Sequence, residues 1–319
     1  MTAVAAAQTE ESAPPSKQPQ PLSRAMLWAR RAPLLPALIF MFLVTQLPFL
    51  ITIAVSFISW NALYPNDIHF GFLSNYINVF TDDSLRGAVV ITILLTAVIV
   101  IVSTAIGLAI ALLLDRRFFG RGVVRTMMIA PFLVVPIAAA LVWKHALLNP
   151  TYGLLNGILT MIWGWFGQAQ NAPQPDWVSD TPLISIELAL IWQWTPFMML
   201  ILLAGLQSRP LDVIEAARVD GASEWQLFRF LTLPHMRQYI ELAVTLGAIY
   251  IVQNFDAVFT ITSGGLGTEN LPYAIYQEFF VAHDYGGASA AGVIVVIGTI
   301  VISTFALRTV SGLLKEESK

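Results

Sequence analysis

The stretch AVVITILLTAVIVIVSTAIGLAIALLL, from Ala88 to Leu114, contains no charged residue. A helix needs about 20 consecutive apolar residues to cross the hydrocarbon core of a bilayer, and this stretch exceeds that length. The rest of the chain fits the same environment, because only 12% of its 319 residues are charged and its mean hydropathy is +0.70. Soluble domains carry roughly 25% charged residues, about twice as many. The sequence therefore predicts an all-α integral membrane protein.

Six apolar segments are long enough to span the membrane. They run over Leu34–Ile58, Ala88–Leu114, Val124–Leu147, Leu183–Leu206, Ile240–Ile261 and Ala288–Leu307. We therefore expect a single six-helix transmembrane domain over residues 32–319. Prolines inside these segments predict kinks, because each proline removes a backbone N–H from its helix. Residues 1–31 are polar and rich in Pro, Gln and Ser, which predicts a disordered tail.

The lysines and arginines give the orientation. All of them except Arg86 and Lys144 fall in the N-terminal tail, in the loops after the second and fourth segments, or at the C-terminus. Positively charged residues are retained on the cytoplasmic side of a membrane protein. Six spans place both termini on the same side, so both termini and these two loops are predicted to be cytoplasmic.

One of these loops, Ser208–Tyr239, reads SRPLDVIEAARVDGASEWQLFRFLTLPHMRQY. It predicts two short helices, of which the first ends at Asp220-Gly221, a common turn pair. The second helix is expected to start at Ser223, with Gln226 at capping-box spacing, and to end before Pro234. This pattern alone fits both a helix pair that rests on the membrane surface and a helix pair that docks into another protein.

Three motifs in this loop decide between the two. They are Glu215-Ala216-Ala217, Asp220-Gly221-Ala222 and Leu231-Thr232-Leu233-Pro234. Together they resemble the EAA loop of binding-protein-dependent ABC importer permeases, with Leu231 in place of the family's isoleucine. The name EAA loop is used below for Ser208–Tyr239.

The resemblance implies a type I ABC importer permease fold with six transmembrane helices and a cytoplasmic coupling helix. In that family the EAA loop docks into a cleft of a separate ATPase subunit. The docking residues that it implies here are Glu215, Ala216, Ala217, Asp220, Gly221, Ala222, Leu233 and Pro234. It also implies three kinds of partner in the plasma membrane of a bacterium: a second permease subunit that is a different chain, an ATPase dimer that binds ATP and Mg, and an extracytoplasmic solute-binding protein.

Further motifs resemble the maltose-type sugar permeases of the same family. These are Gly71–Tyr76, Tyr152–Asn156, Asn254–Asp256 and Thr262–Thr268, with Leu266 where the family has proline. The run Asn270–Tyr273 resembles polyol permeases. The resemblance covers the chain from about residue 70 onward and implies that the solute is a carbohydrate, either a sugar or a polyol.

The chain is not expected to be an enzyme or to bind a cofactor. None of its lysines follows a glycine, so it lacks the Gly-Lys-Ser/Thr ending of a Walker A motif, and ATP hydrolysis is left to the partner. It has no cysteine, and its four histidines do not show the spacing of metal ligands. A net charge of −3 without a basic stripe does not indicate nucleic-acid binding.

Polar side chains inside apolar segments are candidates for the solute path, because they are costly in lipid and are usually functional. They are Trp192 and Gln193 in the fourth segment, and Tyr250, Gln253, Asn254 and Asp256 in the fifth. Amides and carboxylates bind sugar hydroxyls, and aromatic faces cover the C–H side of a sugar ring. The same residues fit a second interpretation, in which they form hydrogen bonds between helices.

Two other functions stay open from the sequence. A permease of the same family for another solute class, such as amino acids or phosphate, would carry the same EAA loop. An ion-coupled secondary transporter would use a carboxylate within the membrane, and Asp256 is the candidate, but such a transporter would leave the EAA loop unexplained.

Overall fold

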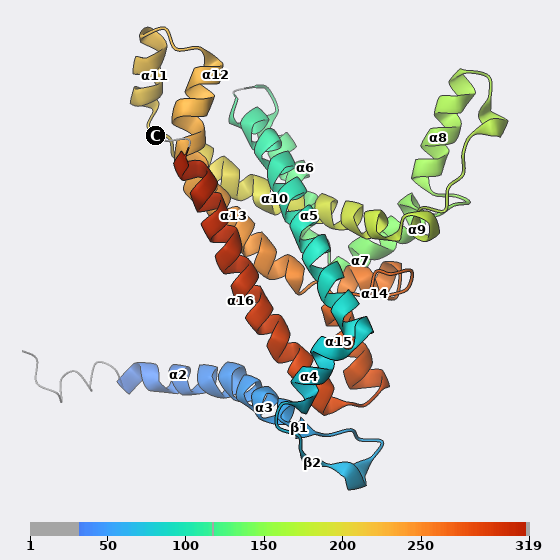
Figure 1. The fold of residues 1–319 in the computed structure, drawn as a ribbon. Helices are drawn as coiled ribbons and strands as arrows, with labels where there is room; N and C mark the ends of the chain where they lie inside the picture. Colours follow the sequence, from blue (N-terminus) through green and yellow to red (C-terminus); the bar gives the residue numbers. More distant parts are fainter. Residues whose placement is uncertain (1–31, 117, 317–319) are drawn as a thin grey trace, which may run out of the picture. The chain divides into compact units, whose positions relative to one another are not determined.

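The computed structural model describes residues 32–116 and 118–316, so the tail predicted to be disordered lies outside the described residues. Helices make up almost all of the regular structure (Figure 1). The chain divides after Ile51 into two compact units, which are described separately.

The first apolar segment is an uninterrupted helical run from Ala32 to Ser56. It consists of a 3₁₀ turn, η1 (Ala32–Leu34), helix α2 (Leu35–Met41), a π turn, η2 (Phe42–Gln46), and helix α3 (Leu47–Ser56). The π turn comes directly before Leu47-Pro48, where the missing N–H of the proline interrupts the normal bonding. Every side chain from Ala32 to Leu50 is exposed within the chain, which suits a helix surrounded by lipid.

The second unit contains a short antiparallel ribbon of β1 and β2, in which Ile58 faces Phe70. Its strands and longer helices are β1 (Ile58–Ser59), β2 (His69–Phe70), α5 (Asp83–Asp115), α6 (Arg121–Leu133), α10 (Pro182–Gln207), α13 (Leu233–Val252) and α16 (Tyr285–Glu316). The shorter helices are α4 (Ser74–Thr81), α7 (Pro136–Leu141), α8 (Leu154–Trp165), α9 (Trp177–Asp180), α11 (Leu211–Val219), α12 (Glu224–Leu227), α14 (Asp256–Ile261) and α15 (Leu271–Tyr276). The 3₁₀ and π turns are η3 (Pro65–Asp67), η4 (Val142–Leu147), η5 (Ala169–Asn171), η6 (Phe228–Thr232) and η7 (Gln277–Val281).

Four helices in the described part of the chain are long and apolar enough to cross a membrane, and a bent pair makes a fifth. The four are Ala32–Ser56, Asp83–Asp115, Pro182–Gln207 and Tyr285–Phe305, which match the first, second, fourth and sixth predicted segments. The third segment is the bent pair, α6 with α7 and η4, which turns by 95°. Pro131 lies inside α6 and Pro136 starts α7, so the predicted proline kink is confirmed.

The fifth segment was predicted as one helix over Ile240–Ile261, and this prediction is wrong. Helix α13 already begins at Leu233 and ends at Val252, and α14 starts at Asp256. The Asn254 Oδ1 atom accepts a hydrogen bond from the backbone N–H of Ala257 at 3.3 Å. A short polar side chain that bonds to the backbone in this way competes with the helix ladder and favours a break.

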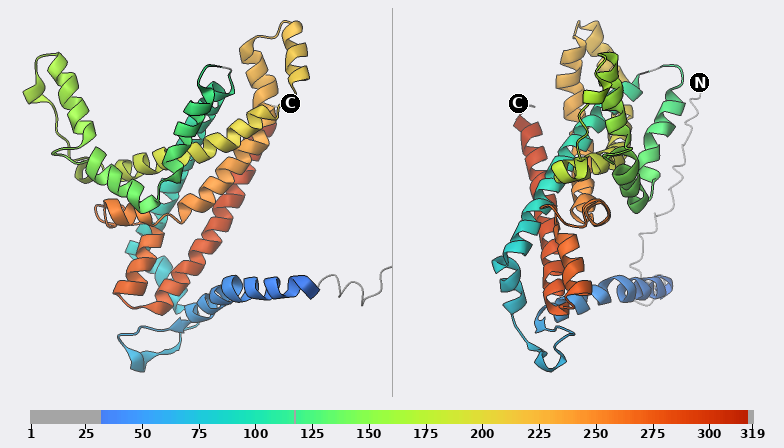
Figure 2. Two further views of the ribbon diagram at one scale, coloured as in Figure 1. Left: turned by 180° about the vertical axis from the view of Figure 1, so that it is seen from behind. Right: turned by 90° about the vertical axis from the view of Figure 1, so that its right-hand side faces the viewer.

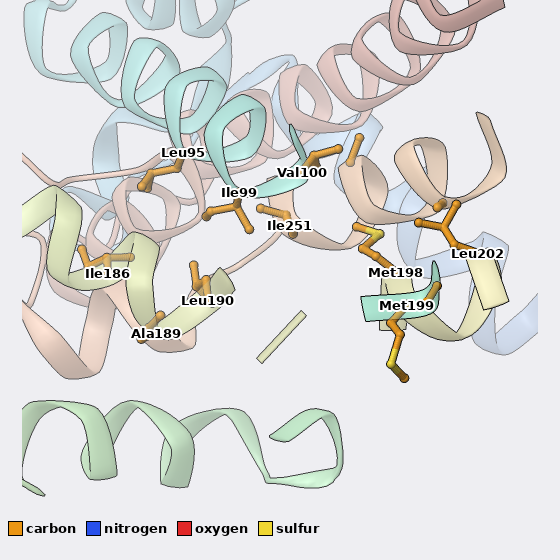
Figure 3. Close-up of a cluster of buried hydrophobic side chains, with 14 of the residues drawn as sticks. Leu95, Ile99, Val100, Ile186, Ala189, Leu190, Met198, Met199, Leu202 and Ile251 are labelled. Carbon is orange, nitrogen blue, oxygen red and sulfur yellow. The ribbon is translucent and has the colours of Figure 1, made fainter. Parts of the chain in front are cut away.

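The core of the second unit lies where α5 packs against α10 and α13 (Figure 3). Ile99, Leu190 and Met198 represent a larger cluster of fully buried side chains in this region. Between membrane helices the hydrophobic effect contributes little, so van der Waals packing and close backbone approach hold them together. Gly107 of α5 provides such an approach, because a side chain there would meet the Met199 nitrogen of α10 at 2.9 Å.

Candidate functional site

The EAA loop folds as a helical hairpin at the end of the second unit where α10 finishes and α13 begins (Figures 1 and 2). The turn between α11 and α12 contains Gly221 with φ of +88°, a conformation that glycine adopts without steric strain. Ser223 starts α12 with a capping box, in which Gln226 Oε1 accepts from the Ser223 N–H at 2.8 Å. Arg218 and Glu224 form an ion pair at 3.1 Å that bridges the two helices. The predicted turn and helix start are confirmed.

The family-matched residues of this loop lie mostly on its surface. Glu215, Ala216, Asp220 and Gly221 are exposed, and Ala217, Ala222, Leu233 and Pro234 are half-buried. Ile214 of α11 and Leu227 of α12 are buried. A cavity of about 430 Å³ lies beside the Asp220–Ala222 turn and reaches Phe230 and Leu231. The surface of the hairpin therefore carries small residues, the carboxylates of Glu215 and Asp220, and a cavity beside the turn.

The predicted helix end before Pro234 is wrong. Helix α12 continues through the π turn η6 directly into α13, and Leu233 keeps helical backbone angles of φ −64° and ψ −42°. The π turn η6 lies directly before Leu233-Pro234, and its wider bonding accommodates the proline, whose missing N–H would interrupt an ordinary α-helix. The second half of the EAA loop is thus one helical run with a membrane helix.

Among the candidate path residues, Gln193 is 6% exposed and donates from Nε2 to the Val134 carbonyl at 3.2 Å. Val134 lies at the bend between α6 and α7, where the helix ladder is interrupted. A carbonyl left free at a helix break in lipid needs such a partner. In this conformation Gln193 forms a hydrogen bond between helices, which is the second interpretation given in the sequence analysis.

The aromatic part of the candidate path centres on Trp194 and Tyr250. Their rings stack at 5.5 Å with 27° between the planes, and Phe197 meets both rings edge-on. Tyr250 is 55% exposed, so one side of this stack is open. Trp192 instead packs edge-on against Trp143 of η4. Trp194 and Phe197, which the sequence analysis did not select, are three residues apart on one helix face, and that spacing was the available signal.

Gln253, Asn254 and Asp256 lie together at the break between α13 and α14. Gln253 is exposed, and Asn254 and Asp256 are half-buried. The backbone carbonyl of Asn254 accepts from Asn270 Nδ2 at 2.6 Å, which ties the break to the start of α15. At the other end of α14, Lys144 donates to the Thr260 carbonyl at 2.8 Å. A cation at a helix C-terminus is stabilised by the helix dipole.

Three asparagines, two from the sugar-permease motifs and one from the polyol-permease run, hold loops in place. Asn75 donates to the Ser56 and Ile58 carbonyls at 3.0 and 2.9 Å. Asn156 donates to the Pro150 and Pro175 carbonyls and accepts from Trp177 Nε1 at 2.7 Å. Asn270 caps α15 through its side chain. Each amide pairs with backbone groups that its loop would otherwise leave unsatisfied.

Helices α4 and α15 lie at the opposite end of the second unit from α11 and α12 (Figure 1), and a cluster of carboxylates lies beside α4. Glu278 of η7 borders a polar cavity of about 430 Å³ together with Asp82 and Asp284. Burial, followed by the negative charges of Asp284, Asp82 and Glu269, raises the pKa of Glu278 to about 7. Glu278 therefore changes charge near neutral pH.

Comparisons with known proteins agree with this geometry. Residues 103–312 match the family described as "Binding-protein-dependent transport system inner membrane component". The chain is 35% identical over 273 residues to "Probable ABC transporter permease protein y4oQ" of Sinorhizobium fredii, covering 84% of this chain and 85% of that protein. It is 33% identical over 227 residues to the trehalose/maltose transport system permease protein MalF of Thermococcus litoralis, covering 70% and 73%. It is 31% identical over 270 residues to the trehalose transport system permease protein SugA of Mycobacterium tuberculosis, covering 85% and 84%.

The fold also matches that of a solved bacterial ABC transporter involved in the import of the acidic polysaccharide alginate. The TM-score is 0.73 at 20% identity, covering 89% of this chain and 95% of that chain. Together with the family match, its helices thus define a membrane-embedded permease with the type I ABC importer fold. The chain belongs to the family of binding-protein-dependent transport system inner membrane components.

Proposed function

We propose that this chain is a permease subunit of a carbohydrate ABC importer in a bacterial plasma membrane, with both termini in the cytoplasm. It pairs with a second permease chain and receives solute from an extracytoplasmic binding protein. A dimer of separate ATPase subunits docks on the EAA loop. ATP and Mg bind that dimer, because this chain lacks a phosphate-binding Gly-Lys-Ser/Thr sequence.

The observation that carries the proposal is the continuity between the EAA loop and the candidate path. The docking turn is exposed at Asp220 and Gly221, and α12 runs through η6 into α13 without interruption. The last turn of α13 holds Tyr250, and the break with Asn254 and Asp256 follows directly. A displacement of the loop by ATPase closure would therefore reach the break along one helical run.

The solute class is supported by the chemistry at that break. The open side of the Trp194–Tyr250 stack offers an aromatic surface for the C–H face of a sugar. Gln253, Asn254 and Asp256 supply amide and carboxylate groups for hydroxyls on the same stretch. Two relatives are named for trehalose, one of them also for maltose, so these disaccharides and polyols are the first solutes to test.

The coupling role is tested by ATPase activity of the purified complex in lipid, with and without solute-loaded binding protein. Glu215→Ala removes the exposed carboxylate, and Gly221→Asp places a side chain at φ of +88°. We expect both variants to assemble and to lose stimulation. Glu224→Ala, in the same loop but outside the family motif, is the matched control and should keep it. If Glu215→Ala and Gly221→Asp both keep full stimulation and transport, the proposal fails, and Asp256 of an ion-coupled carrier becomes the next residue to test.

The solute path is tested separately by uptake into vesicles. Tyr250→Ala and Asp256→Asn should reduce trehalose, maltose or polyol uptake while leaving basal ATPase activity in place, because neither residue belongs to the EAA loop. Tyr250→Phe is the matched control, since it keeps the ring that stacks on Trp194. Wild-type uptake by Tyr250→Ala would remove the aromatic surface from the proposed path.

A further inference from the structure

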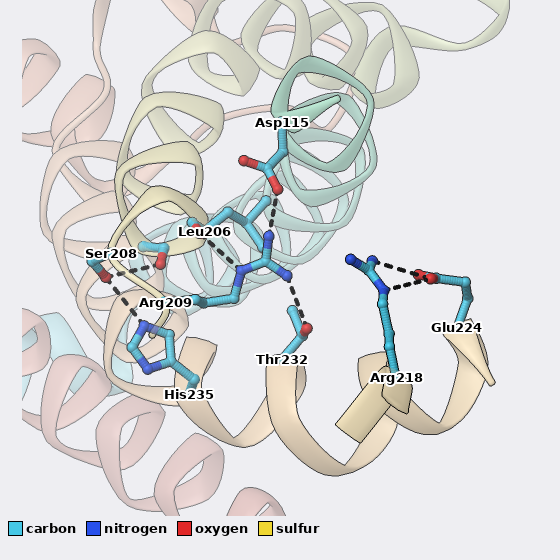
Figure 4. A network of polar contacts seen from close by, with 9 residues as sticks. Asp115, Leu206, Ser208, Arg209, Arg218, Glu224, Thr232 and His235 are labelled. Atoms are coloured by element: carbon cyan, nitrogen blue, oxygen red, sulfur yellow. Dashed lines mark hydrogen bonds and ion pairs between the residues drawn. The ribbon is translucent and has the colours of Figure 1, made fainter. Parts of the chain in front are cut away.

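Arg209 joins three helices at the base of the EAA loop (Figure 4). It lies in the connection between α10 and α11. Its Nε donates to the Leu206 carbonyl at 2.8 Å, and its Nη1 donates to Thr232 Oγ1 at 2.9 Å. Its Nη2 forms an ion pair with Asp115. Leu206 belongs to α10, Thr232 ends η6, and Asp115 is the last residue of α5.

This pair is more shielded from water than the Arg218–Glu224 pair of the same loop. The side chains of Arg209 and Asp115 are 16% and 24% exposed, whereas those of Arg218 and Glu224 are 53% and 79% exposed. Salt and water screen an exposed pair strongly and a buried one much less. The planar guanidinium also fixes the directions of its bonds, so one side chain sets the relative positions of three backbones.

A neighbouring contact links α10 to α13 without involving α5. Ser208 Oγ lies 3.1 Å from His235 Nε2 (Figure 4). It also lies 2.7 Å from the Tyr239 hydroxyl. A side chain at Gly205 would collide with the Tyr239 side chain, so Tyr239 packs directly against the backbone of α10. Loss of Arg209 would leave this α10–α13 joint in place and would remove the ion pair that ties Asp115, at the end of α5, to the loop.

We propose that Arg209 is a positioning residue that makes the end of α5 move together with the EAA loop during the ATP cycle. This inference rests on the proposed coupling function. Without the Arg209–Asp115 pair, the loop moves α10 and α13 while the end of α5 lags behind. ATP hydrolysis then continues without the full rearrangement of the helices around the path.

The test measures distances between spin labels in the full complex, without nucleotide and with ATP and vanadate. The chain has no cysteine, so introduced cysteines are its only labelling sites. One pair joins Leu113→Cys, near the end of α5, to Arg229→Cys in η6, and both positions are exposed. A reference pair joins Arg229→Cys to Ile77→Cys of α4, at the opposite end of the unit.

In the wild type we expect the reference distance to shift between the two states and the Leu113–Arg229 distance to stay the same. Arg209→Gln, and the isosteric Asp115→Asn, should make the Leu113–Arg229 distance shift as well. Exchange of the pair, Arg209→Asp with Asp115→Arg, should restore the wild-type result, and Arg218→Gln is the matched control that should not change it. ATPase activity of each variant verifies assembly.

A Leu113–Arg229 distance that shifts in the wild type, or that stays constant in both single variants, overturns the inference. Asp115→Asn keeps the side-chain volume and leaves Arg209 its two other bonds, so it serves if Arg209→Gln does not assemble. If the reference distance also stays constant in the wild type, the EAA loop does not respond to nucleotide and the proposed function fails too. If Glu215→Ala abolishes stimulation but the labels contradict the expectation, only the role of Arg209 fails.

Discussion

Gly107 lies where α5 approaches the backbone of α10 closely, and its replacement by alanine gives a sharp prediction. A Cβ atom at this position would lie 2.9 Å from the Met199 nitrogen, 3.0 Å from the Met198 Cβ and 3.3 Å from the Met198 carbonyl carbon. Two of these atoms are backbone and cannot rotate away. The helix α10 would have to move as a whole, and with it the packing of the core around Met198 and Met199.

The magnitude follows from two opposing contributions. Adding a methyl group to a packed core costs about 1–3 kcal/mol. Because two of the three nearest atoms at Gly107 are backbone, we place the cost at the upper end, ~3 kcal/mol. Alanine has a higher helix propensity than glycine by about 1 kcal/mol, so the net loss for Gly107→Ala is about 2 kcal/mol. Gly87 lies on the same helix with no atom within 4 Å of its added Cβ. Gly87→Ala should therefore gain up to ~1 kcal/mol, which makes the difference between the variants about 3 kcal/mol.

The measurement is unfolding by SDS in mixed micelles, followed by far-ultraviolet circular dichroism. Both variants make the same chemical change in one helix, so effects on the unfolded chain cancel to a first approximation. Gly247→Ala is a third variant for the comparison of stabilities. It would meet only the end of the flexible Met198 side chain, so its effect should fall between the other two. Equal stabilities for Gly87→Ala and Gly107→Ala would refute the close approach of α5 and α10.

Three further predictions concern single side chains. Gln193→Leu leaves the Val134 carbonyl at the bend unpaired and should cost about 1–3 kcal/mol in the same unfolding assay, and a wild-type value would contradict this role. The pKa of Glu278 is raised from 4.5 to about 7, so the folded state holds the extra proton between these values. This contribution to stability is complete below pH 4.5 and is lost as the pH rises through about 7, so Glu278→Gln should flatten the pH dependence of thermal stability, and an unchanged slope would argue against the shift. Asn156→Ala removes the bond to Trp177 and two backbone bonds, so limited proteolysis between α8 and α9 should be faster than in the wild type.

Much of the fold was predictable because it depends on local sequence. The bilayer requires long apolar runs, and the described helices Asp83–Asp115 and Pro182–Gln207 coincide with two of those predicted. The capping box at Ser223 and the glycine turn at Gly221 depend on residues three or fewer positions apart, and both are present. Such features need no knowledge of what lies on the neighbouring helix.

The two wrong predictions concern helix ends: the expected end before Pro234 and the single helix expected over Ile240–Ile261. A proline after Leu233 disfavours an ordinary helix, but the π turn before it absorbs the mismatch. The fifth segment has the hydropathy of one membrane-spanning helix. The Asn254 side chain bonds to the backbone, however, and α13 ends at Val252, inside the segment. A hydropathy window averages over both effects and detects neither.

The candidate path could not be assigned from sequence because one residue type serves two purposes in a membrane. Gln193 and Tyr250 are both polar side chains in apolar segments, and the sequence treats them alike. The difference lies in their surroundings: Gln193 is buried against a carbonyl that the α6–α7 bend has freed, while Tyr250 keeps more than half of its surface open beside Trp194. A kink therefore frees a backbone carbonyl that needs a polar side chain as its hydrogen-bond donor. Polar residues that do not bond to such a carbonyl are the better candidates for binding solute. By that criterion we propose that Tyr250, Gln253 and Asp256 are the first path residues to test, whereas the contact of Gln193 with Val134 is explained by the bend.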